Sequence, residues 1–498
     1  MSVGVLLALT GPVESALVSA LDAAGTGVRV VRRCADVPEV LAAAAAGLGA
    51  VAVLSADLPG VDRTVLARLR AAQVRTVLVA HERDRQRCAA LGADAVEPAE
   101  TPAAALADVV VAVARAGGDG AGGVASDGDG ARGAGREGRE GREGREGRGG
   151  AGNELDAGRG DGRDGKRADG RPAVGERADG SPGDGEDGDG VAGDDPASGP
   201  GRPAAAGSAG DDGPGRLVVV WGPPGAPGRT TVAVTLAAEL AALAGTALLV
   251  DADTEAPSVT QALGLLDDSS AIAVAARQAT HGHLDAATLA RVCPVVDGGL
   301  RVLTGLTRAD RWRELPGAAL EVLWEVARQG SPWTVVDVGA GLEADAGFDQ
   351  AFGPQRHQAA VSALAAADVV IVVGAGEPVG IRRLVMALGE LGDRRLLRAD
   401  AERVVVVNRV RASAAGPRAA RSIHEALARF AGVADAVLVP DDRPALDKAV
   451  LQGRTLTRVA PSSAAREALH QLARDLAGVT APRRPRRRGA LLGTARPG

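Results

Sequence analysis

The chain has little of several residue types: no tyrosine, three phenylalanines, four tryptophans and three cysteines among 498 residues. So few aromatic side chains argue against a platform that stacks the bases of RNA or single-stranded DNA. The cysteines, Cys34, Cys88 and Cys293, are far apart and odd in number, which argues against a disulfide framework or a zinc ribbon. No apolar run reaches about 18 residues and no basic signal segment opens the sequence, so we expect a cytoplasmic protein.

Lysine is also scarce, and charge is unevenly distributed. Only Lys166 and Lys448 are lysines, and the other 55 of the 57 basic residues are arginine. Residues 117–215 contain 34 Gly, 13 Lys or Arg and 22 Asp or Glu, a net charge of −9, whereas the rest of the chain carries +3. That composition cannot bury enough apolar surface to offset the entropy of ordering, so we interpret 117–215 as a disordered linker.

Short apolar runs alternate with Ala/Leu-rich helical patterns on both sides of this segment. In residues 1–116 they predict strands at Val5–Leu9, Val28–Arg32, Ala50–Leu54, Val74–Val79 and Ala95–Val96. In residues 216–480 they predict strands at Leu217–Trp221, Ala247–Val250, Leu300–Leu303, Thr334–Val338, Val369–Val373, Val404–Val407 and Ala436–Val439, and helices that include Thr230–Leu243, Ile381–Leu391, Ala419–Phe430 and Ser463–Leu476. We therefore expect an α/β protein with two doubly wound parallel-sheet domains, and a basic disordered tail at 481–498.

A glycine- and proline-rich loop follows the predicted strand Leu217–Trp221. It leads through Gly228, Arg229, Thr230 and Thr231 into a helix, which is the context of a phosphate-binding P-loop. The strict pattern GxxxxGK[ST] is broken, because Pro223 takes the place of the first glycine and Arg229 that of the lysine. Taken alone, the loop is equally compatible with a plain strand-to-helix turn.

Carboxylates follow two further predicted strands. Asp251 and Asp253 end ALLVDAD, and Asp337 ends WTVVDV, with Gly341 four residues later. The carboxyl ends of parallel strands open on one edge, so Thr230 is a candidate Mg²⁺ ligand with Asp251 and Asp337 holding its waters. Asp253 is then a candidate for orienting an attacking water.

Together these segments resemble the ParA/MinD class of P-loop ATPases over about 260 residues. In that class the loop reads KGGxGK[ST]T, and the two acidic strands end DxD and DxxxG. The resemblance implies ATP and Mg²⁺ as cofactors, Arg229 and Asp253 as catalytic residues, and Thr230, Asp251 and Asp337 as the metal site. It assigns nucleotide binding to Gly225, Ala226, Gly228, Arg229, Thr230, Thr231, Gly341, Asn408, Arg409, Pro440 and Asp441, the last four bordering the adenine.

Residues 1–116 are similar to a response-regulator receiver that has lost its phosphorylation chemistry. The run AVAVLSADLPGVD from Ala50 matches the receiver pattern DxxxPGxD, with Ser55 at the phosphoacceptor position and Glu97 at that of the lysine. A pseudo-receiver joined to a MinD-like ATPase resembles the CpaE/TadZ pilus-assembly proteins and the actinobacterial septum site-determining proteins. That layout implies protein partners in septum or pilus/secretion machinery, and the ParA/MinD class implies a homodimer.

Departures from the family leave alternatives open. Pro224 stands where the class has the lysine that reaches the partner subunit's phosphates, so we expect slow ATP hydrolysis or none. The alternatives are a nucleotide-binding scaffold without turnover and a chromosome-partition ParA-like protein that binds DNA through arginines. The tail sequence RRPRRR at Arg483–Arg488 is a candidate for contact with an anionic membrane or DNA, which leaves peripheral attachment at a membrane or cell pole open.

Overall fold

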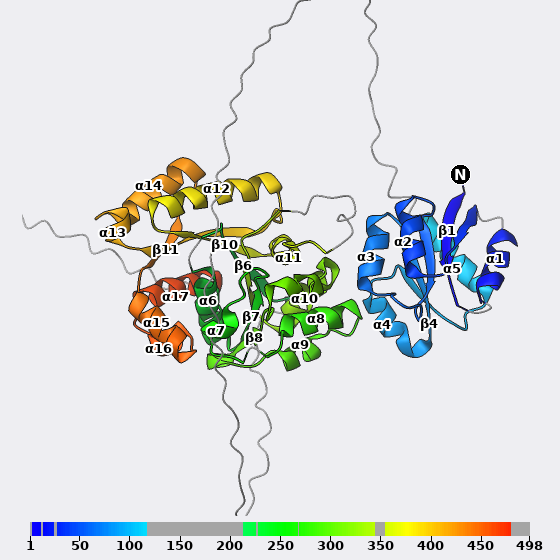
Figure 1. Ribbon diagram of the computed structural model, residues 1–498, viewed down its shortest axis with the longest axis horizontal. Coiled ribbons are helices and arrows are strands. Elements are labelled where there is room, and N and C mark those ends of the chain that lie inside the picture. Colours follow the sequence, from blue (N-terminus) through cyan, green and yellow to red (C-terminus); the bar gives the residue numbers. More distant parts are fainter. Residues whose placement is uncertain are drawn as a thin grey trace, which may run out of the picture. The chain divides into compact units, whose positions relative to one another are not determined.

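The computed structural model describes residues 2–10, 13–23, 27–116, 213–225, 228–266, 268–343 and 354–479. These residues form two parallel β-sheets with helices on both faces, which confirms the predicted α/β, doubly wound fold class (Figure 1). The predicted linker, except for residues 213–215, and the predicted tail lie outside the described residues. None of the described helices combines the length and the apolar character needed to cross a membrane.

The smaller sheet has five strands in the order β2-β1-β3-β4-β5, the doubly wound order of flavodoxin-like proteins. Its strands are β1 Val3–Ala8, β2 Val28–Arg33, β3 Val51–Ser55, β4 Arg75–Ala80 and β5 Ala95–Pro98. Its helices are α1 Val13–Ala23, α2 Val37–Ala45, α3 Arg63–Ala71, the short 3₁₀ turn η1 Glu82–Asp84, α4 Arg85–Ala90 and α5 Ala103–Ala116. Alternate strand side chains point to opposite faces, so one set packs against α1 and α5 and the other against α2, α3 and α4.

The larger sheet has seven strands in the order β12-β11-β10-β6-β9-β7-β8, and all its strand pairs are parallel. Its strands are β6 Arg216–Trp221, β7 Ala247–Ala252, β8 Leu300–Leu303, β9 Trp333–Val338, β10 Val369–Ala375, β11 Glu402–Val410 and β12 Ala436–Pro440. Each lies at a predicted strand, because a strand buried on both faces is a continuous apolar run.

Helices cover both faces of the larger sheet. In the first half they are α6 Arg229–Ala244, α7 Val259–Ala262, α8 Ala271–Thr280, α9 Ala286–Val292, η2 Asp297–Gly299, η3 Ala309–Glu314 and α10 Gly317–Gly330. In the second half they are α11 Gln358–Ala366, α12 Pro378–Arg394, α13 Ala412–Ala415, α14 Ala419–Ala431, α15 Arg443–Gln452, α16 Leu456–Val459 and α17 Ala464–Leu476. The four helices predicted by residue range are present as α6, α12, α14 and α17.

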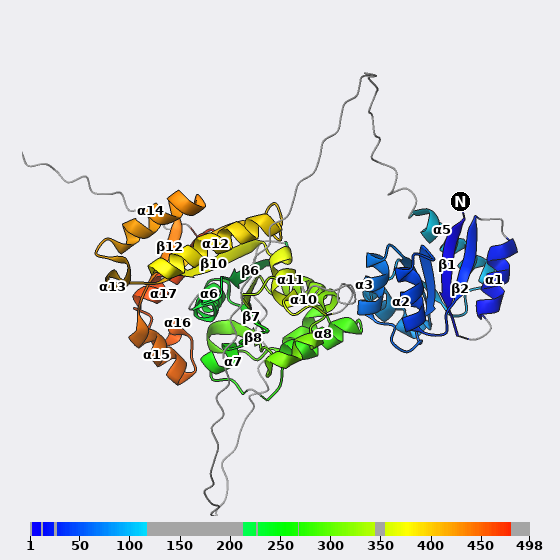
Figure 2. The same cartoon turned by 45° about the horizontal axis from the view of Figure 1, so that its top comes forward.

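The helix that follows the glycine-rich loop is the most enclosed. Residues 232–241 of α6 are all buried, between the sheet and α17, which lies beside α6 in both views (Figures 1 and 2). The helices α8, α10, α11, α12 and α14 pack against the other face of the sheet. The start of α6 is therefore held firmly at the carboxyl edge of β6.

Candidate functional site

The loop between β6 and α6 depends on two glycines with left-handed backbone angles. Gly225 has φ of 73°, and Gly228, the residue before the first helical residue, has φ of 94°. A β-carbon would also collide with the side chain of Arg383 at Gly225 and with that of Asn408 at Gly228. The first N–H groups of α6 have no partner within the helix, so the loop presents an arrangement that can bind an anion.

The Arg229 side chain turns back onto its own loop. Its Nη1 donates to the carbonyl oxygens of Gly222 and Pro223, at 3.1 and 3.4 Å. Its Nη2 lies 3.5 Å from Oδ2 of Asp253. The guanidinium therefore lies against the loop backbone and is paired with one of the predicted catalytic carboxylates.

Sheet register brings the three predicted carboxylates together. Asp251 on β7 is paired directly with Asp337 on the neighbouring β9, and Asp253 is the first residue after β7. All three side chains are buried. The sequence prediction that these residues meet at one edge of the sheet agrees with this geometry, and their roles stay predictions.

Hydrogen bonding separates Asp337 from the other two. The carboxylates of Asp251 and Asp253 accept backbone N–H groups of the segment that follows β7. For Asp251 these belong to Ser258 and Val259, both at 3.0 Å, and to Asp253 at 3.2 Å; for Asp253 they belong to Glu255 at 2.9 Å and Ala256 at 3.0 Å. Neither oxygen of Asp337 has a hydrogen-bond partner among the described residues. Burying a polar group without a hydrogen-bond partner costs free energy, so Asp337 would be stabilised by a bound ligand or by taking up a proton.

The protonation of this pair follows from the same enclosure. Burial raises the pKa of the Asp251 carboxyl to about 7. Burial, and then the neighbouring charge of Asp251, raises the pKa of Asp337 well above its ordinary value. Burial is the main cause of both shifts, and the nearby Thr230 hydroxyl and Arg229 oppose the rise in the pKa of Asp337 only in part. A cation brought to this edge would favour the ionised forms.

The first turn of α6 brings Thr230 to the same edge. Its Oγ1 lies 3.1 Å from Oγ of Ser258, whose N–H donates to Asp251. No group of three or more His, Cys, Asp or Glu side chains is arranged to hold a metal ion in the part of the chain that the structure describes. Mg²⁺ usually keeps several waters and combines few protein ligands with phosphate oxygens, so a Thr230 hydroxyl beside the unpartnered Asp337 fits this ion.

Asn408, near the end of β11, lies beside the loop. It is buried against Gly228, and its Oδ1 accepts the N–H of Arg409 at 2.8 Å. Arg409 has φ of 56°, a conformation that side-chain hydrogen bonding from the preceding asparagine supports. The structure therefore brings Asn408 to the loop, as a residue bordering a bound nucleotide would need.

The neighbouring strand end holds the other two residues predicted at the adenine. Pro440 ends β12 and is paired in register with Val410 of β11. Asp441 follows it, and its carboxylate lies 3.5 Å from Arg411 and 3.4 Å from Arg443. Pro440 and Asp441 thus lie one strand further from the loop than Asn408. The Asp441 carboxylate already forms ion pairs with two arginines.

The remaining predicted residues lie on either side of the acidic group. A β-carbon on Gly341, three residues after β9, would collide with the ring of His357, whose Nδ1 lies 3.2 Å from Oε1 of Glu255. Thr231 is half-buried in the first turn of α6. Ala226 lies outside the described residues.

Three solved structures to which this chain is similar are ATPases of the ParA and MinD kind. A ParA family ATPase from Chlorobium tepidum TLS is 17% identical, with 52% of this chain and 98% of that chain covered and a TM-score of 0.44. The cell division ATPase MinD of Pyrococcus furiosus is 20% identical, with 53% and 100% covered and a TM-score of 0.41. The septum site-determining protein MinD of Pyrococcus horikoshii OT3, complexed with Mg-ADP, is 19% identical, with 53% and 98% covered and a TM-score of 0.41. No protein-family model and no curated protein matches the chain.

A buried ionic cluster that the sequence analysis missed joins α6 to α17. The Glu239 carboxylate accepts from Nε and Nη2 of Arg466 at 2.6 and 2.8 Å and from Thr457 at 2.7 Å, and Nδ1 of His470 lies 2.7 Å away. Burial alone would raise the pKa of Glu239, but these contacts more than offset it and hold the pKa below its ordinary value. The available signal was a single carboxylate in the otherwise apolar run VTLAAELAALA.

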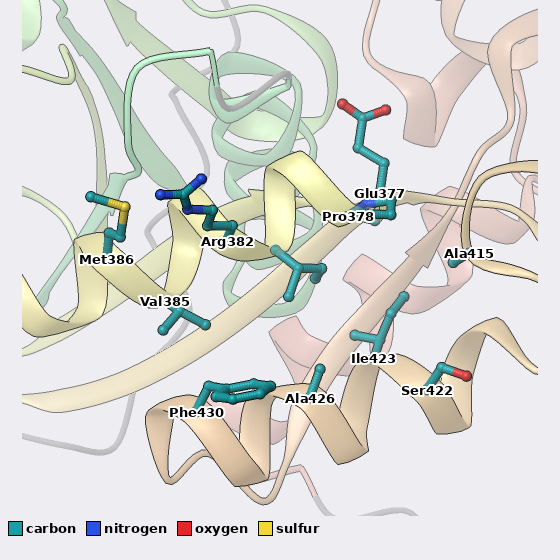
Figure 3. A pocket seen from close by; sticks show the side chains of 12 residues that line it. Glu377, Pro378, Arg382, Val385, Met386, Ala415, Ser422, Ile423, Ala426 and Phe430 are labelled. Atoms are coloured by element: carbon teal, nitrogen blue, oxygen red, sulfur yellow. The ribbon is translucent and has the colours of Figure 1, made fainter.

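A separate apolar groove of about 570 Å³ lies between α12 and α14 (Figure 3). Of the twelve residues that line it, Val385, Ile423, Ala426 and Phe430 place apolar side chains between the two helices (Figure 3). Arg382 and Glu377 point away from that space in the same view (Figure 3). The α14 side of α12 is therefore mainly apolar, and the charged end of Arg382 lies at the margin of the groove.

Proposed function

We propose that residues 216–480 bind Mg²⁺ and ATP at the loop after β6 and form a slow ATPase of the ParA/MinD kind. The observation that carries the proposal is the buried Asp337, which sheet register holds beside Asp251 and which has no partner among the described residues. Next to it, the unpaired N–H groups at the start of α6 favour an anion. A ligand that brings a cation and phosphates together satisfies both features.

Each group of the site has a defined task in this proposal. Bound Mg²⁺ would neutralise phosphate oxygens and fix their geometry. The Thr230 hydroxyl would be a ligand of the ion, and Asp251 and Asp337 would hold its waters. The N–H groups of residues 228–231 would hold the phosphates, and Asn408 would border the base.

Arg229 would couple nucleotide binding to catalysis. To reach the phosphates, its guanidinium must leave the loop carbonyls and its 3.5 Å contact with Asp253. That movement frees the Asp253 carboxylate to orient the attacking water. Turnover would be slow because Pro224 cannot deliver a cation, and a trans-acting Arg in phosphoryl transfer is worth roughly 10³–10⁵ in rate.

The cellular role is proposed on the combined sequence resemblance. Residues 1–116 would be a pseudo-receiver that docks protein partners, and the ATPase would position septum or pilus/secretion machinery as a homodimer. The protein would act in the cytoplasm and attach peripherally at a membrane or cell pole. The basic tail assigned to membrane or DNA contact lies outside the described residues.

The test is to measure Mg²⁺·ATP binding to the full chain, both by calorimetry and by the change in tryptophan fluorescence. All four tryptophans lie within residues 221–333, and the Trp221 indole at the end of β6 donates to the Ala340 carbonyl at 3.1 Å. We expect Arg229→Ala to weaken binding about 10–100-fold, the value of a charge-assisted hydrogen bond, and Arg229→Lys to bind at least as tightly as the parent.

The matched variant is Asp253→Ala, which should leave binding intact and remove hydrolysis. Absence of binding at millimolar nucleotide would overturn the proposed site. Binding without turnover by the parent chain would favour the scaffold alternative, which Pro224 supports. A DNA affinity that falls steeply with salt would favour the chromosome-partition alternative.

A further inference from the structure

Helix α12 brings a second guanidinium to the glycine-rich loop. Arg383 lies in the second turn of α12, and its Nη1 lies so close to Gly225 that any β-carbon there would collide with it. The contact crosses 158 residues of sequence and depends on glycine at the loop position. Arg383 therefore lies against the first half of the loop, whereas Arg229 begins the helix that follows its second half.

Arg383 has no acidic partner in the part of the chain that the structure describes. None of the ion pairs among the described residues includes it, although Arg229 in the same region is paired with Asp253. Residues 222–225 carry no charged side chain of their own, because their sequence is Gly-Pro-Pro-Gly. Arg383 is thus a second cation beside this stretch of backbone, next to Arg229, which donates to the carbonyls of Gly222 and Pro223.

Two cations on one short loop point to an anion between them. Arg229 donates to the carbonyls of Gly222 and Pro223, and Arg383 lies at Gly225, so like charges share a four-residue stretch. Asp253 compensates the charge of Arg229, whereas Arg383 is in no ion pair among the described residues, so a negative group bound at this loop would be attracted to Arg383. The phosphates of a nucleotide held at the start of α6 are such a group.

We propose that Arg383 binds the polyphosphate of ATP within its own subunit, as a second cation of the site. The inference rests on the proposed nucleotide binding and adds a residue that the P-loop pattern does not contain. The proposal explains why residue 225 is glycine, because a β-carbon there would collide with the Arg383 guanidinium. It also places one residue of α12 in direct contact with the nucleotide. Arg383 is not among the residues that line the apolar groove between α12 and α14.

The experiment measures Mg²⁺·ATP affinity of the full chain by calorimetry for Arg383→Ala, Arg383→Lys and Arg382→Ala. Loss of Arg383 should weaken ATP binding about 10–100-fold, as expected for a charge-assisted contact, and lysine should restore most of it. Arg382 is exposed on the same turn of the helix, so Arg382→Ala is the matched control and should bind as the parent does. Inorganic triphosphate, which displaces ATP without a base, should lose the same factor in the Arg383→Ala chain.

The outcomes separate this inference from the function on which it rests. If the parent chain does not bind ATP, the proposed function fails and Arg383 has no such role. If the parent binds and Arg383→Ala binds equally well, or loses ATP without losing triphosphate, the polyphosphate assignment alone is wrong. Unfolding followed by tryptophan fluorescence should be unchanged by Arg383→Ala, since the side chain is exposed; an unfolding change together with no rescue by lysine would show a structural role instead.

Discussion

The two sheets are both parallel and covered by helices on both faces, but they differ in strand order and in what they bury. Among the described residues, the smaller sheet and its helices bury only Ser55 and Thr76 as polar side chains, whereas the larger sheet and its helices bury four carboxylates. These are Glu239, Asp251, Asp253 and Asp337. Burying an ion costs several kcal/mol unless partners compensate for it. The larger sheet therefore has a desolvation cost from its carboxylates that the smaller sheet does not have.

The carboxyl edges of the two sheets differ in how their buried polar side chains are hydrogen-bonded. At the end of β3, Ser55 accepts the N–H of Thr10 at 2.9 Å, and the Thr10 hydroxyl lies 3.2 Å from the same oxygen. The buried Ser55 is therefore satisfied by neutral groups of Thr10, and the charged side chains at this edge, among them Asp57 and His81, line an open pocket. At the end of β9, Asp337 has no such partner. The two edges thus differ in whether the buried polar group has a partner among the described residues, and the following changes test that difference, from the largest expected effect to the smallest.

Removal of Glu239 should have the largest effect on stability. Glu239→Ala leaves Arg466 without its buried partner, and breaking a buried pair in this way costs about 3–5 kcal/mol in the free energy of unfolding. Urea unfolding followed by tryptophan fluorescence reports on this region alone, because residues 1–116 contain no tryptophan. Glu467→Ala is the control, since Glu467 contacts the same arginine at 3.6 Å but is 69% exposed.

The pH dependence of stability provides a second test of the role of Glu239. The pKa of Glu239 is lower in the folded chain than in the unfolded chain, so its stabilisation is present above the unfolded pKa and is lost as pH falls through the folded one. The cost of Glu239→Gln should therefore shrink below about pH 4.5. A cost under about 1 kcal/mol at pH 7 would contradict a compensated buried charge.

Asp337→Asn should act in the opposite direction and stabilise the chain without nucleotide by about 1–3 kcal/mol at pH 8. The pKa of Asp337 is raised in the folded chain, so the unfolded chain loses this proton first and stability falls as pH rises above the unfolded pKa. Asparagine does not titrate, so its advantage should grow as pH rises above about 4, the unfolded pKa of an aspartate. An advantage that is constant with pH would mean that Asp337 has a partner after all.

Gly228→Ala should cost about 1–2 kcal/mol for its left-handed angle and should also disturb the loop. Its matched control is Gly245→Ala at the end of α6, where φ is 81° but a β-carbon meets nothing within 4 Å. The two variants share the backbone cost, and only Gly228→Ala displaces Asn408. We expect nucleotide affinity to fall in Gly228→Ala alone; equal affinities would show that the approach of Asn408 does not matter.

The sequence predictions agree with the structure where a local sequence pattern determines the element. The apolar run at Leu217–Trp221 is β6 within one residue, and the meeting of Asp251 with Asp337 follows from parallel strand ends. The helix expected at Ile381–Leu391 begins earlier, at Pro378, because proline at the first helical positions is preorganised for a helix.

The contacts that could not be predicted join distant segments. Glu239 and Arg466 are 227 residues apart, and no periodicity in either helix indicates that they face each other. The direction of Arg229 depends on where Asp253 lies once the sheet has formed, and the approach of Arg383 depends on the crossover to α12. Such pairings are fixed by packing rather than by motif spacing.

The smallest expected effect concerns the smaller sheet, where we predict that acetyl phosphate leaves residues 1–116 unmodified. Ser55 stands at the phosphoacceptor position, is buried, and is engaged by both polar groups of Thr10. Ser55→Ala removes these contacts and should cost only about 0.5–1.5 kcal/mol, measured by hydrogen exchange of β1 and β3 because this region has no tryptophan. Mass spectrometry of the intact chain after acetyl phosphate treatment, with the Ser55→Ala chain as control, checks the first point. A phospho-aspartate within residues 1–116 would show that this edge retains ligand chemistry, and the contrast between the two sheets would then fail.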